Sequence, residues 1–217
     1  MERYITLGDY NTWYDWQLIL TAKDVAPPEA KTNYIDLEGA HGTLDLSEAL
    51  TGEVTYSDRT VSASFVCTEG SHQDREKLLR QIAHVLHGKK VKIIEPDDPD
   101  HYFLGRVRIK SVKKYAAYME FTLEAVCDPW RYAIEETHRT VVLSGGDVSV
   151  VINNNGVKTL CPDLAVTGTV EVTYNGASVE LTEGIYRVAD IKLRQGVNVV
   201  TVAGNGSVTF TYREAGL

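Results

Sequence analysis

The stretch YMEFTLEAVCDPWRY, residues 118–132, determines the expected fold class and marks a change in the character of the chain. Its first ten residues alternate between polar and apolar side chains, the period-two pattern of a half-buried β-strand. One face of this strand is formed by Met119, Phe121, Leu123, Ala125 and Cys127. The opposite face is formed by Tyr118, Glu120, Thr122 and Glu124. We expect both glutamates to be exposed to solvent.

The segment CDPWRY, residues 127–132, is either the corner of an active site or a joint between two domains. Pro129 cannot donate to a β-ladder, so we expect it to end the ladder of the preceding strand. The amphipathic rings of Trp130 and Tyr132 suit the packing of a strand exit against a neighbouring domain. A nucleophilic Cys127 would need a histidine base beside it, and no motif places one there. We therefore interpret Pro129, Trp130 and Tyr132 as structural residues of a domain junction.

The chain before this junction is predicted to be mainly strands with one helix. Residues 59–69 (RTVSASFVCTE) alternate as a strand. Residues 71–87 form the helix, with Ser71 as its N-cap, Asp74 at the positive end of its dipole and Gly88 as its stop. The apolar stripe of this helix consists of Leu78, Leu79, Ile82, Val85 and Leu86. A β-hairpin is expected over about residues 90–112.

The chain after the junction contains short β-rich runs separated by turn signals, with no helical pattern over residues 138–213. Asn175-Gly176 is a strong signal for a type I′ hairpin turn. We therefore divide the chain into an N-terminal domain, residues 1–132, and an all-β antiparallel sandwich, residues 133–217.

Composition and motifs argue against several functional classes. The net charge of −8 disfavours binding to nucleic-acid phosphates. The three cysteines, Cys67, Cys127 and Cys161, are expected to be buried free thiols, because their number is odd and no CxxC occurs. No signal peptide or membrane-spanning stretch is evident, so we expect a soluble protein made in a reducing compartment.

No catalytic, metal or cofactor site is predicted. His84 and His87 are three residues apart on the helix, but no third metal ligand is evident, so a solvated face is favoured. Asp97, Asp98 and Asp100 lack the spacing of an EF-hand and are interpreted as turn residues. No GxSxG, HExxH, P-loop or GxGxxG motif occurs, and we expect the protein not to be an enzyme.

Several segments, in the same order along the chain, resemble the distal tail protein family of phages with long non-contractile tails and of related prophages. The early segment comprises residues 32–52 (TNYIDLEGAHGTLDLSEALTG) and 56–65 (YSDRTVSASF). The helix and hairpin comprise residues 75–93 and 98–107, and the end of the first domain is FTLEAVCDPWRY, residues 121–132. The second domain is represented by residues 152–172 and 193–214. This second domain lacks large insertions, which lowers the expectation of host-sugar recognition.

The resemblance implies a fold and a role. It implies an N-terminal β-sandwich with a helix and a β-hairpin, followed by a galectin-like antiparallel β-sandwich. It also implies a homohexameric ring at the tail tip, possibly stacked, with an open channel for DNA. The ring would join the tail tube to the fibre or lysin protein and contact the tape-measure protein, without membrane insertion or specific nucleic-acid binding. The expected location is the virion tail tip, after assembly in the host cytoplasm.

Residues 34–50 suit an extended arm that lies on a neighbouring subunit, because they are punctuated by glycine and partly apolar. The same pattern also fits an ordinary surface loop, or leucines that belong to the subunit's own core. If the segment is an arm, its candidate interface residues are Tyr34, Ile35, Leu37, Leu44 and Leu46.

A carbohydrate-binding module is the alternative function. Such modules stack sugars on exposed aromatic rings. All three tryptophans, however, precede the all-β half. The aromatic residues of that half are Tyr174, Tyr186, Phe210 and Tyr212, and some of them must fill its core.

Overall fold

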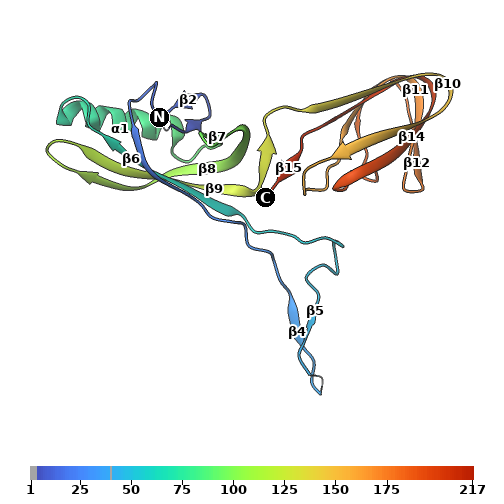
Figure 1. The fold of residues 1–217 in the computed structure, drawn as a ribbon, viewed down its shortest axis with the longest axis horizontal. Helices are drawn as coiled ribbons and strands as arrows, with labels where there is room; N and C mark the ends of the chain where they lie inside the picture. The colour runs from blue at the N-terminus through green and yellow to red at the C-terminus, as the bar shows by residue number, and fades with distance from the viewer. Residues whose placement is uncertain (1–3, 40) are drawn as a thin grey trace. The chain divides into compact units, whose positions relative to one another are not determined.

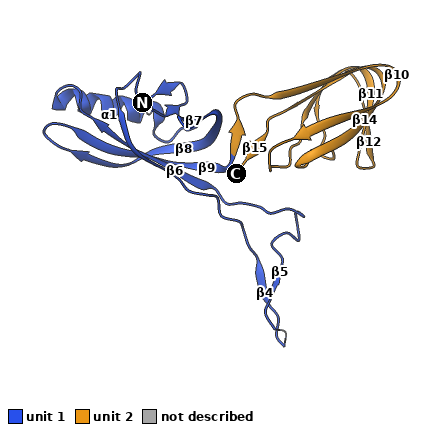
Figure 2. Cartoon of the chain, viewed as in Figure 1, with its two compact units in different colours: residues 1–130, 217 blue, residues 131–216 orange. Residues whose placement is uncertain are grey.

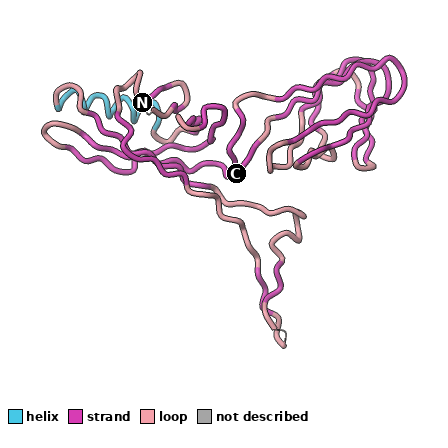
Figure 3. The backbone as a smooth tube through the Cα atoms, in the orientation of Figure 1, coloured by secondary structure: helices cyan, strands magenta, loops and turns pink. Residues whose placement is uncertain are grey.

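The structure, a computed structural model, describes residues 4–39 and 41–217. It divides into two compact units (Figure 2): unit 1 comprises residues 1–130 with Leu217, and unit 2 comprises residues 131–216. Most of the described chain is β-strand, and helix α1 (His72–Leu86) is its one α-helix (Figure 3). The expected fold class, mainly β with one helix, is confirmed. Among the described residues, no helix combines the length and the apolar composition that crossing a bilayer requires.

Unit 1 is built on one antiparallel sheet with the strand order β2-β1-β7-β8-β9-β6-β3 (Figure 1). Strands β4 and β5 form a separate two-stranded sheet. The strands are β1 (Thr6–Leu7), β2 (Tyr10–Asn11), β3 (Ile19–Val25), β4 (Tyr34–Asp36), β5 (Thr43–Asp45), β6 (Arg59–Cys67), β7 (Lys90–Glu95), β8 (Asp98–Lys114) and β9 (Met119–Ala133).

The core of unit 1 follows from the alternation of β6 and β9. The five apolar side chains expected on one face of β9 are all buried, and they lie beside the buried residues of β6. The ring centroids of Phe65 and Phe121, for example, are 5.7 Å apart. Ile82 and Leu86 of α1 are buried in the same cluster. Burial of a phenylalanine, leucine or isoleucine side chain in this core stabilises the fold by about 1.5–3 kcal/mol.

Helix α1 begins and ends at the residues that its sequence indicates. Ser71 is the N-cap and forms a capping box with Asp74, which satisfies backbone N–H groups that the first turn leaves unpaired. The helix ends at Leu86, and Gly88 follows with a φ of +79°, in the left-handed region. On the first turn, the buried Arg75 donates to the carbonyl oxygens of Gly70 and Ala116.

Unit 2 is an all-β unit with its own hydrophobic core. Its antiparallel sheet has the order β10-β14-β11-β12, and β13 also pairs with β11. Asn175 and Gly176 form the expected two-residue turn between β11 and β12, with φ values of +48° and +82°. The strands are β10 (Thr137–Asn154), β11 (Asp163–Tyr174), β12 (Ala177–Leu181), β13 (Gly184–Arg187), β14 (Gly196–Tyr212) and β15 (Ala215–Gly216).

A β-bulge in β10 keeps both halves of this long strand on the same core. The register with β14 shifts between Ser144 and Asp147, so an extra residue is inserted there. Before the bulge, odd-numbered residues such as Leu143 are buried; after it, even-numbered residues such as Val150 are buried. Because side chains alternate between faces, one inserted residue exchanges the two faces and returns the apolar set to the core.

The expectation that Pro129 ends the ladder of its strand holds for the neighbour β6, but the strand itself continues past the proline. Strand β9 continues to Ala133, although its ladder with β6 stops at the pair Arg59–Cys127. Proline is tolerated here because the β6 ladder ends two residues before it. Pairing resumes two residues later, where Arg131 lies opposite Gly216 in β15.

Candidate subunit interface

The most unusual part of unit 1 is the segment between β3 and β6, residues 26–58, which we call the arm. It leaves the sheet as an extended two-stranded ribbon (Figure 1). Near the sheet, the backbone N–H of Lys31 donates to the Thr55 carbonyl and that of Ser57 donates to the Glu29 carbonyl, both at 2.8 Å. Farther out, β4 pairs with β5. The two sides of the arm are therefore paired at its root and in the β4–β5 hairpin, with turns and loop between these points.

The outer hairpin of the arm is held by local polar contacts. Ile35 lies opposite Leu44 in the ladder. The backbone N–H of Asn33 donates to Ser47 Oγ at 2.8 Å, and Ser47 N–H donates to the Asp45 carboxylate at 2.9 Å. Hydrogen bonds from Ser47 lower the pKa of Asp45 below its ordinary value. Ala40 lies outside the described residues.

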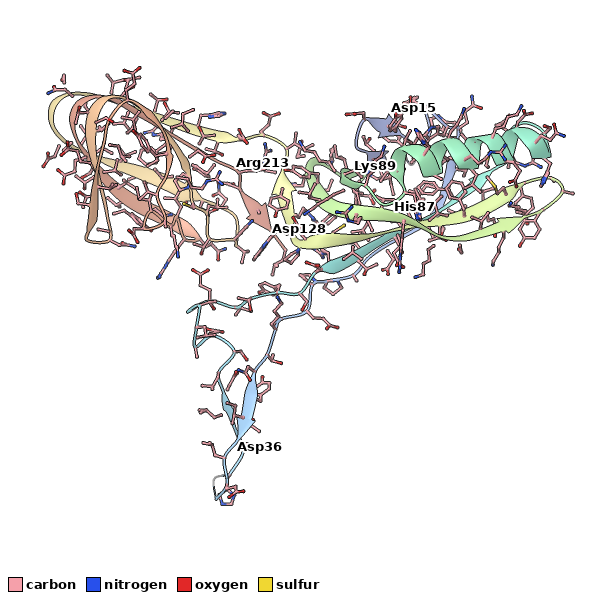
Figure 4. The ribbon with its side chains drawn as sticks, turned by 180° about the vertical axis from the view of Figure 1, so that it is seen from behind. Asp15, Asp36, His87, Lys89, Asp128 and Arg213 are labelled. Carbon is pink, nitrogen blue, oxygen red and sulfur yellow. The ribbon has the colours of Figure 1, made fainter. Side chains whose placement is uncertain are left out.

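The hairpin has two chemically different faces, because side chains alternate along each strand. Ile35, Leu37 and Leu44 share one face, whereas Asp36 and Asp45 share the other. Figure 4 shows Asp36 on this outer part of the arm. The structure thus places apolar and acidic side chains back to back on a ribbon only two strands wide.

The candidate interface residues are not part of the protein's own core. The exposed fractions are 57% for Tyr34, 42% for Ile35, 50% for Leu37 and 45% for Leu44, and Leu46 is half-buried. This exposure excludes the reading in which these leucines fill the core of their own subunit. Whether a neighbouring subunit covers them remains a prediction.

Arg59 fixes the root of the arm, and our sequence reasoning missed it. Its guanidinium is buried and donates to the carbonyl oxygens of Ala26, at 2.9 Å, and Pro129, at 3.3 Å. It also lies over the Phe103 ring, 4.9 Å from the centroid. One side chain therefore joins the first residue of the arm to the end of β9 and to the core. The sequence signal that could have identified Arg59 is the position of an arginine at the start of an alternating strand with one apolar face.

Trp130 and Tyr132 each have an aromatic contact inside their own unit. Trp130 is half-buried and meets Tyr56 of the arm edge-on, with centroids 5.6 Å apart. Tyr132 lies in unit 2, where the Lys158 ammonium is 4.9 Å from the centroid of its ring. The division between the two units falls after Trp130. The segment CDPWRY thus also supports the root of the arm.

The expectation that Glu124 is solvated is wrong. Glu124 is 6% exposed and accepts hydrogen bonds from Lys110 and Arg108 of β8. These contacts, with that from Lys110 the largest, lower the pKa of Glu124. The neighbouring strand supplies two cations, and this register was not readable from the alternation of β9 alone. Glu120 is half-buried on the same strand.

Three of the groups considered for metal binding, His87, Asp97 and Asp98, have structural partners. His87 Nδ1 accepts from the Ile109 N–H at 3.1 Å. Asp97 pairs with Lys23, and Asp98 pairs with His101. Within residues 4–39 and 41–217, no three histidine, cysteine or carboxylate side chains cluster as a metal site.

The thiols are not arranged as nucleophiles. Burial raises the pKa of Cys127 to about 12 and also raises the pKa values of Cys67 and Cys161. All three cysteines are free; Cys67 and Cys127 are buried as expected, and Cys161 is half-buried. At neutral pH these thiols are protonated, so they lack the thiolate that nucleophilic attack needs.

Comparison with known proteins identifies a fold. No family model matches the sequence, and no curated protein matches it. The crystal structure of the Dit protein (gp 19.1) of phage SPP1 superposes with a TM-score of 0.73 at 15% identity, covering 99% of both chains. That protein is described as a paradigm of the hub of the adsorption apparatus in phages that infect Gram-positive bacteria. The phage p2 baseplate in its activated conformation gives a TM-score of 0.47 at 8% identity, covering 96% of this chain and 97% of that chain.

The protein therefore has the fold of a phage tail hub subunit. More particularly, its whole length follows the fold of SPP1 Dit. This confirms, for the fold, the resemblance to distal tail proteins.

Proposed function

We propose that the protein is a structural subunit of a ring-shaped hub at the tip of a non-contractile phage or prophage tail. In this role it joins the tail tube to the fibre or lysin protein, leaves a channel for DNA and catalyses no reaction. The hub is a homohexamer. The tape-measure protein is a further partner, and assembly takes place in the host cytoplasm.

The exposed arm is the observation that supports this proposal most directly. A two-stranded ribbon is at best marginally stable alone in water. Here the ribbon is anchored by a buried arginine and exposes a row of apolar side chains. A subunit that closes a ring with identical neighbours needs two different surfaces that complement each other, and the arm offers one of them. The superposition on SPP1 Dit over 99% of both chains supports the same assignment.

The direct test is the double variant Leu44→Asp with Leu46→Asp. Since both leucines lie outside the protein's own core, the variant should keep the wild-type circular dichroism spectrum and melting temperature. It should lose the oligomer in sedimentation velocity, because carboxylates in place of buried leucines oppose the contact.

A matched control introduces the same charges elsewhere. Val142 and Ile185 of unit 2 are 76% and 78% exposed, and Val142→Asp with Ile185→Asp should leave assembly unchanged. The proposal fails if the wild-type chain stays monomeric at every concentration and in the presence of its tail partners. If the Leu44/Leu46 variant is folded and still assembles, the arm is not part of the subunit interface.

One surface feature favours the alternative of carbohydrate binding. An open pocket of about 460 Å³ in unit 1 is lined by Trp13, Tyr14, Gln17 and Glu69, among others. The Tyr14 side chain is 68% exposed, and aromatic faces beside polar groups suit a sugar ring. A glycan array separates the two functions: specific binding by a monomer that is lost in Trp13→Ala would favour the sugar-binding function.

A further inference from the structure

Most of the protein's net negative charge lies in the arm. Residues 26–58 contain seven carboxylates and one lysine, a net charge of −6 out of the −8 of the whole chain. The carboxylates are Glu29, Asp36, Glu38, Asp45, Glu48, Glu53 and Asp58. The arm is therefore an acidic ribbon with an exposed apolar stripe, and a surface that receives it should offer cations around apolar side chains.

One face of the sheet of unit 1 has this composition. The ladder pairs Lys90 with Arg106 and Lys92 with Leu104, while the adjacent pair Ile93–Phe103 is buried in the core. Side chains alternate, so these cations point away from the core. The cations of this outer face are Lys90, Lys92, Arg106, Arg108 and Lys110, and all five are exposed.

Part of this positive charge has no carboxylate partner among the residues that the structure describes. Lys90 pairs with Asp128, and Arg108 and Lys110 share Glu124. Lys92 lies over the Tyr102 ring, and Arg106 donates to the Gly88 carbonyl oxygen. Among the described residues, neither Lys92 nor Arg106 forms an ion pair with a carboxylate.

The same face offers apolar surface among the cations. Leu104 of β8 is half-buried, and Val126 of β9, on the outer face, is 48% exposed. Val126 therefore leaves apolar surface open to solvent on the sheet that bears the cations. A ribbon with an apolar face, and with carboxylates such as Glu38 and Glu48 beyond the ends of its ladder, complements such a surface in both charge and hydrophobicity.

We propose that the arm of one copy docks on the outer face of β7 and β8 of a second copy. The apolar stripe of the hairpin covers Leu104 and Val126, and the carboxylates beyond the β4–β5 ladder, Glu38 and Glu48, lie among Lys92, Arg106 and their neighbouring cations. This inference rests on the proposed function, in which identical copies associate. It adds to that function the surface on which the arm docks and an attraction between opposite charges that holds the arm there.

Charge reversal on each side tests the docking. The arm variant is Glu38→Lys with Glu48→Lys, and the face variant is Lys92→Glu with Arg106→Glu; all four residues are exposed. Each variant alone should weaken self-association at least tenfold in sedimentation equilibrium at 50 mM NaCl, a salt concentration at which surface charges act over roughly 10 Å or more. Mixed in equal amounts, the two variants should assemble again. The positively charged arm of the arm variant can bind the negatively charged face of the face variant, and the unchanged arm of the face variant can bind the unchanged face of the arm variant.

The matched control reverses two cations on helix α1, Lys77→Glu with Arg80→Glu, and changes the net charge by the same amount. It should self-associate like the wild type. Circular dichroism melts of all variants show that the subunit fold is kept.

The outcomes separate this inference from the proposed function. A wild-type chain that never associates overturns the hub and the docking together. A wild-type oligomer that the face variant leaves intact, or that the helix control weakens equally, overturns the docking and leaves the hub standing. Failure of the mixture to assemble, when each variant is folded, also overturns the pairing of arm with face.

Discussion

Arg59 connects three parts of unit 1 through one buried side chain. Its guanidinium donates to two backbone carbonyls and lies over the Phe103 ring. A buried carbonyl that loses its donor is costly, because water cannot replace the lost hydrogen bond. The direction in which the arm leaves the sheet therefore depends on a residue outside the exposed part of the arm.

Replacing Arg59 by alanine should destabilise unit 1 by about 2–3 kcal/mol, since it leaves the Ala26 and Pro129 carbonyls without this donor. Urea unfolding followed by circular dichroism measures the loss. Arg80→Ala, an exposed arginine on α1, is the control and should change the free energy of unfolding by less than about 0.5 kcal/mol. Equal stability of the two variants would contradict the anchoring role of Arg59.

Glu124 gives unit 1 a dependence on pH. Hydrogen bonds from Lys110 and Arg108 lower its pKa in the folded chain, so the unfolded chain binds the proton more readily. The stabilisation is complete above the ordinary glutamate pKa and is lost as the pH falls through the lowered value. Glu124→Gln should therefore be less stable than the wild type at pH 7, and the difference should shrink below about pH 4.

Urea titrations at pH 7 and pH 3.5 measure this difference, and Glu120→Gln on the same strand serves as the control. A Glu124→Gln variant whose deficit is the same at both pH values would show that the carboxylate charge is not the source of the stability.

Trp130 and Tyr56 should be energetically coupled. Because Trp130 is half-buried, Trp130→Ala should destabilise unit 1 by about 1–3 kcal/mol, less than a fully buried tryptophan would. In a double-mutant cycle with Tyr56→Ala, an edge-on ring pair predicts a coupling of about 0.5–1.5 kcal/mol. Strictly additive losses in thermal unfolding would mean that the ring contact contributes nothing.

At the scale of elements, strands β11 and β14 of unit 2 approach each other so closely at one point that only glycine fits there. Gly168 of β11 lies opposite Gly206 of β14, near the bulge of β10. A Cβ added at Gly206 would lie 1.8 Å from the Thr167 carbonyl oxygen, and the φ of Gly206 is +137°. Neighbouring strands thus pass too close for any side chain at this point.

Gly206→Ala should therefore destabilise unit 2 by several kcal/mol or prevent it from folding, because backbone must move to relieve the clash. Gly216→Ala is the control, since no atom lies within 4 Å of the Cβ that it would add. Thermal unfolding followed by near-ultraviolet circular dichroism compares them. A Gly206→Ala variant as stable as the Gly216→Ala variant would refute the close approach.

The sequence was informative for elements with a strong local signal. Alternation identified β6 and β9, the cap and stripe located α1, and Asn175-Gly176 located a hairpin. It was uninformative where the answer depends on register. The partners of Glu124 come from β8, and the residues that Arg59 joins are 33 and 70 positions away in the chain. For the arm, the pattern identified the right residues but could not exclude that they fill a core.

At the scale of the whole molecule, each unit has its own core. The core cluster of unit 2 consists of residues from Val141 to Tyr212, and that of unit 1 consists of residues from Ile5 to Cys127. The boundary between the compact units, after Trp130, lies two residues before the boundary proposed from the sequence. Whether the two units are independent folding domains remains a proposal.

A fragment of residues 131–217 should fold alone, because its buried residues pack against one another and its β15 ladder lies at Arg131 and Tyr132. The fragment should give a cooperative thermal transition and dispersed amide signals in a nuclear magnetic resonance spectrum. A fragment that is collapsed and non-cooperative would show that unit 2 needs the rest of the chain.

The charge of the arm has a consequence for newly made chains. A two-stranded ribbon exposes two unpaired edges, and ribbons of this kind with apolar side chains tend to pair with one another and aggregate. Seven carboxylates on each arm make such pairing unfavourable, since two arms at −6 repel. The same charges therefore oppose the aggregation of free subunits through their arms before a ring assembles.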